Sequence, residues 1–349
     1  KRDRKAAAAS RARAGASSIG VGASVMAASS PLLLAALAVF FAAVAAAALD
    51  TSPVAFDAGY AALFGGDNLV RSPDGRGVTL KLDRYTGSGF VSKAAYRHGF
   101  FSASIKLPGD YTAGVVVAFY LSNWDDYPKN HDELDFELLG NRRGHGWRVQ
   151  TNMYGNGSTA RGREERYLLP VDATATASHR YAIAWTPNNV VFYLDGVPIR
   201  EVVRVPSMGG DFPSKPMSVY ATIWDGSNWA TDGGKYKVDY AYAPFAAEFS
   251  DLVLTGCDAS GVAGAEECQV DLLTHDVAVM APAKRAAMRD FREGYLTYTA
   301  CRDRVRYKTT VFPECDDLAD GRSTFHEWGE SKKTRRRSSS PLLYSSRMQ

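Results

Sequence analysis

The chain has 349 residues, of which 46% are hydrophobic and 11% are aromatic. This apolar content is enough for a packed core, in one large β domain or in two smaller domains. The formal net charge is only +3, and the excess of positive charge lies at the two ends of the chain. The middle of the chain therefore shows no surface suited to nucleic acid.

The chain begins with a segment that we expect to be removed from the mature protein. An uncharged apolar run covers residues 32–49 and includes an A-x-A cleavage pattern at residues 46–48. A membrane-spanning helix needs about 20 apolar residues, so an anchor is nearly possible by length, but the alanine-rich end favours a secretory signal peptide. Met26 opens a complete signal-peptide pattern, so translation is expected to start there. We assign residues 1–48 to a leader and signal peptide.

Residues 49–250 are predicted to form an all-β domain. They contain short runs rich in β-branched and aromatic residues, bounded by turn residues, at 78–83, 100–107, 114–122, 147–154, 180–186, 190–196 and 217–225. This spacing, without long helical periodicity, indicates an antiparallel β-sandwich of the jelly-roll, concanavalin-like kind. Hairpin turns are predicted at Asn188-Asn189 and Asp195-Gly196.

The heptapeptide HDELDFE carries four acidic side chains and alternates in polarity. On a strand it places Glu133, Asp135 and Glu137 on one face, and Leu134 and Phe136 on the other. A solvated strand face would normally mix charge signs, because neighbouring charges of one sign are destabilising. A calcium site is the serious competitor, since hard cations bind clustered carboxylates.

Glycoside hydrolysis gives a positive reason for the two glutamates. Four strand steps separate Glu133 from Glu137, which is roughly 13 Å between Cα atoms at about 3.3 Å per residue. Leaning together, the carboxyl groups would lie about 5–6 Å apart, whereas retaining glycosidases need roughly 5–5.5 Å and inverting ones about 6.5–9.5 Å. The spacing is compatible with retention without proving it. Close like charges push the two pKa values apart, so that one group attacks and the other holds a proton.

A C-terminal extension is expected at residues 251–316, with helical patterning at 275–295. It holds all four cysteines of the chain, which are Cys257, Cys268, Cys301 and Cys315. Four cysteines allow three pairings, of which the two local loops 257–268 and 301–315 are the simplest in an oxidising compartment. The spacing lacks C-x-x-C, which argues against zinc.

A glycosylation sequon within the β domain and a C-terminal tail complete the organisation of the chain. Asn156-Gly157-Ser158 is a glycosylation sequon, which we expect to be accessible in a secreted protein. Residues 317–349 are basic and rich in serine, and are expected to be a disordered tail.

The segment HDELDFELLGN resembles the catalytic signature of plant xyloglucan endotransglucosylase/hydrolases, members of glycoside hydrolase family 16. The similarity continues through AGVVVAFYLS, QTNMYGNGSTARGREER, VPIREV and MGGDFPSKPMSVYATIWDGSNWATDGGKYKVDYAYAPF, and covers roughly residues 55 to 316. The resemblance implies a curved jelly roll with a cleft on its concave face. It also implies that Glu133 is the nucleophile, Asp135 its helper and Glu137 the acid/base.

The resemblance further implies a set of substrate-binding residues. A glucan offers flat apolar faces and a rim of hydroxyl groups, which suit aromatic, amide and arginine side chains. The positions that match acceptor-side contacts are Trp224, Trp229, Tyr120, Gln150 and Arg163. The alternative roles are core packing for the tryptophans, strand packing for Tyr120, a surface amide for Gln150 and a solvated side chain for Arg163. His131 is expected to orient the catalytic strand, with an exposed histidine as the alternative, and Arg306 to flank the cleft.

The chain departs from the family pattern in two places. The segment SNWDDYPKNHD before the catalytic motif is a few residues longer than in many members, so Trp124 and Tyr127 are expected to add a contact beside the cleft. The sequon that many members carry after the motif is absent, because Asn141 is followed by two arginines, and Asn156 is expected to replace it. The pattern is most similar to the third group of the family, which includes both transglucosylases and hydrolases.

These observations predict a secreted, retaining, endo-acting enzyme of the plant cell wall and apoplast that needs no cofactor and no metal. Its partners are expected to be xyloglucan and an oligosaccharide acceptor, with no nucleic acid, no membrane after signal removal, and a monomeric state. A calcium-dependent wall-polysaccharide-binding lectin on the same sandwich is the alternative. A structural wall protein, whose basic tail from Lys332 to Arg337 pairs with acidic pectin, is the third possibility.

Overall fold

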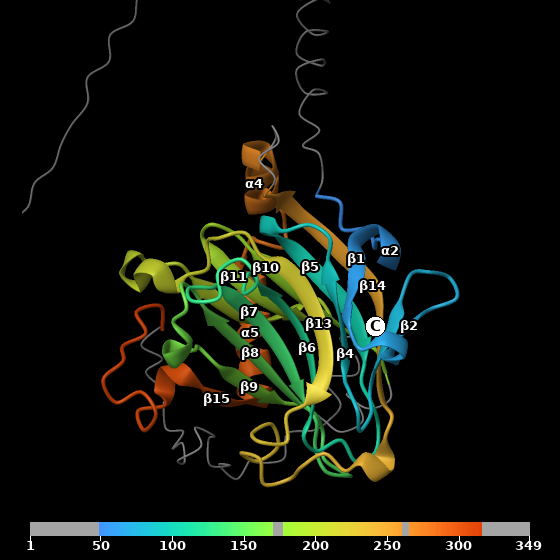
Figure 1. Cartoon of the computed structure of the whole chain (residues 1–349). Coiled ribbons are helices and arrows are strands. Elements are labelled where there is room, and N and C mark those ends of the chain that lie inside the picture. Colours follow the sequence, from blue (N-terminus) through green and yellow to red (C-terminus); the bar gives the residue numbers. More distant parts are fainter. Residues whose placement is uncertain (1–48, 170–176, 260–264, 316–349) are drawn as a thin grey trace, which may run out of the picture. The chain divides into compact units, whose positions relative to one another are not determined.

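The computed structural model describes residues 49–169, 177–259 and 265–315. The expected leader at 1–48 and the expected tail at 317–349 lie outside these ranges. In the described part of the chain the strands form one eight-stranded and one seven-stranded antiparallel sheet (Figure 1). The prediction of an antiparallel β-sandwich is confirmed.

The sheets are built from strands far apart in sequence. In spatial order the first sheet contains β1 (Tyr60–Phe64), β4 (Ser88–Ser92), β13 (Ser218–Asp225), β6 (Val115–Ser122), β7 (Glu133–Leu139), β8 (Arg148–Tyr154), β9 (Glu165–Leu168) and β15 (Leu296–Thr299). The second contains β12 (Val197–Val203), β11 (Asn189–Leu194), β10 (His179–Trp185), β5 (Tyr96–Lys106), β14 (Phe245–Asp258), β3 (Val78–Leu82) and β2 (Leu69–Arg71). The α-helices are α2 (Phe56–Gly59), α4 (Ala265–Thr274) and α5 (Pro282–Tyr295). None of the helices in these described ranges is long and apolar enough to cross a membrane.

The main core lies between the two sheets. Phe136 of β7 is fully buried and meets Tyr181 of β10 and Phe192 of β11 edge-on, at 5.5 and 5.3 Å between ring centroids. Edge-to-face packing suits the charge distribution of aromatic rings. The apolar face of β7 is thereby fixed against the second sheet, which leaves its acidic face on the outside.

All seven runs predicted as strands lie in strands, but their boundaries shift. The run 100–107 covers only the second half of β5, whose first half contains His98 with a φ of 70°. The turn Asp195-Gly196 has φ values of 50° and 76° and joins β11 to β12, as expected for a two-residue hairpin. The short strands β1, β2, β9 and β15 were not predicted; β1, β2 and β15 lie at sheet edges, and β9 lies between β8 and β15.

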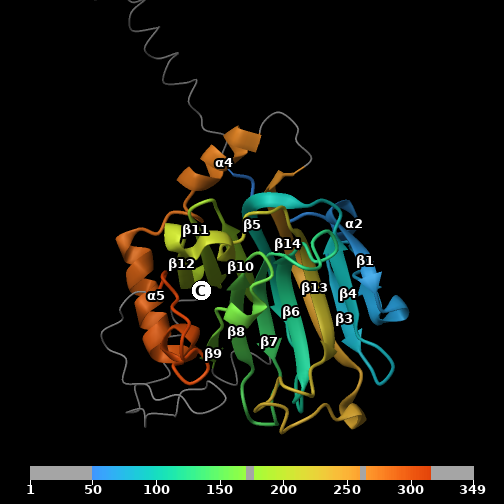
Figure 2. The ribbon, with the colours of Figure 1, turned by 60° about the vertical axis from the view of Figure 1, so that its left-hand side comes forward.

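The C-terminal extension is joined to the sandwich by strands. β14 crosses the expected boundary at residue 250 and runs to Asp258, and β15 pairs with β9 at the edge of the first sheet. Helix α5 packs along β12 (Figure 2). The helix begins only at Pro282, because proline fits the first turn of a helix, and α4 was not predicted. The disulfides are Cys257–Cys268 and Cys301–Cys315, which confirms the two local loops.

Candidate active site

The acidic face of β7 is set by its place in the middle of the first sheet. β7 lies between β6 and β8, and its register puts Glu133 opposite Tyr154 and Glu137 opposite Gln150. Leu134 is fully buried, whereas Glu133 and Glu137 are partly exposed. The predicted alternation is confirmed, and the acidic side chains share one face of the sheet.

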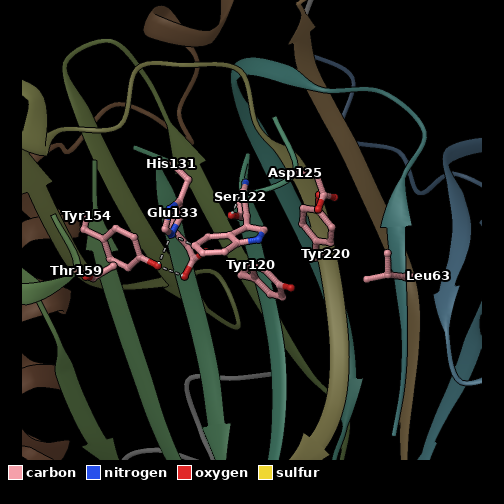
Figure 3. A pocket seen from close by; sticks show the side chains of 10 residues that line it. Leu63, Tyr120, Ser122, Asp125, His131, Glu133, Tyr154, Thr159 and Tyr220 are labelled. Atoms are coloured by element: carbon pink, nitrogen blue, oxygen red, sulfur yellow. Dashed lines mark hydrogen bonds and ion pairs between the residues drawn. The ribbon is translucent and has the colours of Figure 1, made fainter. Parts of the chain in front are cut away.

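Each acidic side chain of β7 has a polar partner on β8. The three residues Gln150, Asn152 and Tyr154 are spaced two apart and therefore share a face, as the three acids do. The hydroxyl of Tyr154 donates to Oε1 of Glu133 at 2.5 Å (Figure 3). The amide nitrogen of Gln150 donates to Oε2 of Glu137.

His131 supports the side chain that holds Glu133. Its Nε2 lies 3.0 Å from the hydroxyl of Tyr154 and 3.9 Å from Oε2 of Glu133 (Figure 3). The imidazole is buried, and its ring packs edge-on against Trp124 at 4.6 Å between centroids. His131 is thus buried beside the start of β7, which excludes an exposed histidine, and its role in orienting that strand stays a prediction.

Asp135 is buried between the two glutamates. Burial, followed by the charges of Glu133 and Glu137, raises the pKa of Asp135 well above its usual range. The neighbouring side chain of Asn152 acts in the opposite direction and lowers this pKa. A carboxyl group with a raised pKa can hold a proton and act as a hydrogen-bond donor to a carboxylate beside it.

Glu137 has a different environment. Burial raises the pKa of Glu137 to about 7, against the lowering effect of the hydrogen bond from Gln150. Glu164 and Glu133 also raise the pKa, and Arg166 lowers it. A carboxyl group that keeps its proton near neutral pH can act as a general acid.

A pocket of about 410 Å³ opens beside Glu133 across several strands. Tyr120 of β6 and Tyr220 of β13 stack at 5.1 Å between ring centroids and form part of its wall. The pocket is lined by Leu63, Tyr120, Ser122, Trp124, Asp125, His131, Glu133, Tyr154, Thr159 and Tyr220 (Figure 3). Tyr120 and Trp124 therefore lie beside the cleft, where the sequence had placed them.

The tryptophan pair lies on the same face of the sheet. Trp224 is four residues from Tyr220 on β13, so the two side chains point to the same side. Trp229 lies 6.0 Å from Trp224 between ring centroids, and both rings are partly exposed. They pack on Val116, Leu139 and Ala230, which puts them near the Glu137 end of β7.

Arg163 is buried and paired within the protein. Only 3% of its surface is exposed, and its guanidinium group pairs with Asp211 at 3.2 Å and with Glu314 of the C-terminal extension. A buried arginine held by two carboxylates offers little surface to a sugar, and the acceptor contact expected for Arg163 stays a prediction.

The side chains of two further residues predicted to contact substrate bind other residues of the protein. Gln150 is buried between Glu137 and Arg166, and Arg306 makes a two-pronged ion pair with Glu164 at 2.5 and 2.9 Å. Arg166 of β9 was not predicted as a site residue, although it follows Glu164 by two residues, a spacing that puts both side chains on one side of an extended chain.

Asn156 lies on the surface at the tip of a turn, with a φ of 51°. Its backbone nitrogen donates to Asp132, at the start of the catalytic segment. The sequon is therefore sterically open, and its glycosylation stays a prediction. Among residues 49–169, 177–259 and 265–315, no three His, Cys, Asp or Glu side chains are arranged to hold a metal ion.

Comparison with known proteins places the chain in a family. The sequence model of glycosyl hydrolases family 16 matches residues 56–242, and that of the xyloglucan endo-transglycosylase C-terminus matches residues 271–315. Among solved structures, Bacillus licheniformis β-glucanase matches with a TM-score of 0.45 and 22% identity, over 57% of this chain and 94% of that chain.

Similar proteins of Arabidopsis thaliana cover most of both chains. "Probable xyloglucan endotransglucosylase/hydrolase protein 29" is 51% identical over 296 residues, which are 80% of this chain and 82% of that protein. "Probable xyloglucan endotransglucosylase/hydrolase protein 28" is 55% identical over 75% of this chain and 79% of that protein. "Xyloglucan endotransglucosylase/hydrolase protein 2" is 41% identical over 75% and 89%. The chain therefore belongs to glycosyl hydrolases family 16, among the plant xyloglucan endotransglucosylase/hydrolases.

Proposed function

We propose that this protein is a secreted, retaining, endo-acting glycosidase that cleaves the β-1,4-glucan backbone of xyloglucan. It transfers the glycosyl group to a second xyloglucan chain or to water. The observation that carries the proposal is the outer face of β7, where Glu133 is held by Tyr154 and Glu137 keeps a proton near pH 7. The names of the similar plant proteins support xyloglucan as the substrate.

In the first step Glu133 attacks the anomeric carbon while Glu137 gives its proton to the glycosidic oxygen. The bond between carbon and oxygen breaks, the reducing-end fragment leaves, and a glycosyl ester forms on Glu133. Asp135 keeps its proton and donates to Glu133, which orients the attacking carboxylate. Tyr154 supplies a second donor to the same group.

In the second step Glu137, now a carboxylate, takes a proton from the incoming hydroxyl group. The hydroxyl oxygen attacks the anomeric carbon and displaces Glu133, so that two inversions restore the original configuration. An acceptor sugar competes with water only if it is held and oriented at the site. The partly exposed rings of Trp224 and Trp229 are suited to hold it.

The location, oligomeric state and modification of the protein are inferred from the same proposed function. We infer secretion to the cell wall and apoplast after removal of a signal peptide, a monomeric state, and a glycan on Asn156. The reaction needs no cofactor, because acid, base and nucleophile are all carboxyl groups of β7. Nothing in the comparisons supports the lectin alternative.

The decisive experiment incubates the purified protein with polymeric xyloglucan and a labelled xyloglucan oligosaccharide. Transfer moves label into the polymer, whereas hydrolysis shortens the polymer and releases reducing ends. Glu133→Ala should abolish both activities with an unchanged circular dichroism spectrum, and activity of that variant would refute the assignment. A 2-fluoro glycoside of a xyloglucan oligosaccharide should label Glu133 and no other carboxylate in peptide mass spectra. A calcium chelator should leave both activities unchanged, whereas release of bound xyloglucan on adding the chelator would favour the lectin class.

A further inference from the structure

A row of alternating charges connects the C-terminal extension to Glu137. Arg306, which follows the short 3-10 helix Ala300–Arg302, donates to both carboxylate oxygens of Glu164. Glu164 directly precedes β9 and lies 3.6 Å from Nη2 of Arg166. The side chains of Glu164 and Arg166 are only 15% and 16% exposed, so water screens this pair weakly.

The row ends in an amide that joins a cation to a carboxyl group. Nε of Arg166 donates to Oε1 of Gln150 at 2.6 Å, and the amide nitrogen of Gln150 donates to Oε2 of Glu137. Arginine has donors and no acceptor. Arg166 therefore fixes the amide with its oxygen towards the guanidinium group and its nitrogen towards Glu137.

This orientation has a chemical consequence for Glu137. Oε2 of Glu137 faces a donor, so a proton on that oxygen would point at another hydrogen. The hydrogen bond from Gln150 therefore favours the proton of the acid form on Oε1. An unanchored amide could turn round and accept this proton, which would leave Oε2 protonated and Oε1 unable to act as an acid.

We propose that Arg306, Glu164, Arg166 and Gln150 act as a positioning relay that keeps the proton of Glu137 on Oε1 and sets how firmly it is held. Under this proposal the C-terminal extension takes part in the acid step without touching substrate. The relay deepens the proposed function and rests on it.

The other groups around Glu137 do not replace the relay. On β7 itself Glu133 raises the pKa of Glu137, and β6 presents only Ala118 opposite it. From the β9 side the two charges act in opposite directions, since Glu164 raises this pKa and Arg166 lowers it. The charged neighbours of Glu137 are thus Glu133 and Asp135 on β7, and Glu164 and Arg166 around β9.

The sign of each substitution follows from these charges. In Arg306→Gln, Glu164 loses the cation that neutralises it, so Glu137 should hold its proton more firmly. In Glu164→Gln, the carboxylate that favours the proton is gone and Arg166 is no longer balanced, so Glu137 should release its proton more easily. Because Arg306 acts through Glu164, Arg306→Gln should add almost nothing in the Glu164→Gln background.

The test is a titration of the side-chain carboxyl carbon of Glu137 by ¹³C nuclear magnetic resonance, in the full-length protein without substrate. Loss of the signal in Glu137→Gln identifies it. We expect the midpoint to rise by about half a pH unit in Arg306→Gln and to fall by about as much in Glu164→Gln. Arg304→Gln, which removes the same charge from an exposed neighbouring position, should leave the midpoint unchanged. The alkaline limb of kcat/KM on xyloglucan should move in the same directions.

If Arg306→Gln melts at a lower temperature than the wild type, Arg306→Lys replaces it in the test, because lysine keeps the positive charge. The titration midpoint of Glu137 in Arg306→Lys should lie between those of the wild type and Arg306→Gln. The proposal is overturned by shifts of the same sign in Arg306→Gln and Glu164→Gln, by no shift in either, or by an Arg306→Gln effect that persists without Glu164. A changed KM in Arg306→Gln, with an unchanged titration midpoint of Glu137, would indicate that Arg306 contacts the sugar and would also overturn the proposal. A wild-type protein inactive on xyloglucan would contradict the proposed function, while the titration would still decide the relay.

Discussion

Tyr154 donates its hydroxyl proton to Glu133 from the position directly opposite on the neighbouring strand. The same hydroxyl lies 3.0 Å from Nε2 of buried His131. The carboxylate of Glu133, the proposed nucleophile, is therefore held by a hydrogen-bonded pair that belongs to two different segments of the chain. A nucleophile fixed in this way reaches the anomeric carbon without losing further orientational freedom.

Tyr154→Phe should lower kcat by roughly ten- to a hundredfold, because a hydrogen bond to a charged group contributes about 1.5–3 kcal/mol. KM should change little, since the ring stays in place. Initial rates on xyloglucan measure both constants. Tyr193→Phe is the matched control. It removes a hydroxyl of β11, in the other sheet, that donates to the backbone oxygen of Val277, so any loss of activity in this variant reports folding alone. An unchanged kcat in Tyr154→Phe would exclude this role.

The pKa of Glu137 gives a pH dependence with a definite sign. The proposed acid must be protonated, and its pKa is raised to about 7, so kcat/KM should fall as the pH rises through about 7. The charge that forms above this pH is partly buried and costs stability in the folded state. Glu137→Gln should therefore raise the melting temperature more at pH 8 than at pH 5. Equal shifts at the two pH values would contradict the raised pKa.

The outer face of β7 was predictable because the side-chain period of a strand is two. One sequence segment contains both the acidic residues and the apolar residues that orient them. Glu133 and Glu137 could therefore be assigned to one face of a strand without knowledge of the rest of the chain. The partners on β8 have the same spacing, but only the register between the strands shows which partner meets which acid.

Arg163 could not be placed in the same way. Its partners Asp211 and Glu314 lie 48 and 151 residues away in the sequence, and nothing in the local pattern shows that they converge. The edge strand β15 was missed for a related reason: four residues carry too short a pattern, and its pairing with β9 depends on the intervening helices.

Trp124 was expected beside the cleft, and it lines the pocket with 54% of its surface exposed. Its backbone nitrogen is held by Ser122 and its ring by His131, so little freedom is lost when a sugar stacks on it. Trp124→Ala should raise KM for polymeric xyloglucan roughly fivefold, for a contact of about 1 kcal/mol, with a small effect on kcat. Tyr85→Ala is the control, because Tyr85 is 88% exposed and outside the pocket lining. Equal KM values in the two variants would exclude a sugar platform at Trp124.

Trp229→Ala separates transfer from hydrolysis. If its ring holds the acceptor, its removal should lower the transfer of label from oligosaccharide to polymer several-fold more than the release of reducing ends, because water needs no platform. Trp229→Phe should recover part of the difference. The ratio of the two rates, measured in one incubation, is the readout. An equal loss of both activities would assign Trp229 to packing against Ala230 instead.

Glu165 fixes helix α5 to the sheet and should make stability depend on pH. Its buried carboxylate accepts from Arg292 of α5 at 2.5 and 2.8 Å and lies 3.6 Å from Arg200. Burial alone would raise the pKa of Glu165, but the two arginines overcome this effect and lower it to about 2.

Because the folded-state pKa lies below the usual 4.5, the stabilisation by Glu165 is present above pH 4.5 and is lost as the pH falls towards 2. A shift of this size corresponds to about 3 kcal/mol. Urea unfolding at several pH values should show this loss in the wild type and in Arg289→Gln, which removes an exposed charge from the same helix. Glu165→Gln should be less stable at pH 6, since the buried Arg200 and the partly buried Arg292 lose their carboxylate, and its stability should change less between pH 4.5 and 2. Parallel pH profiles for Glu165→Gln and the wild type would show that the acid dependence comes from other carboxylates.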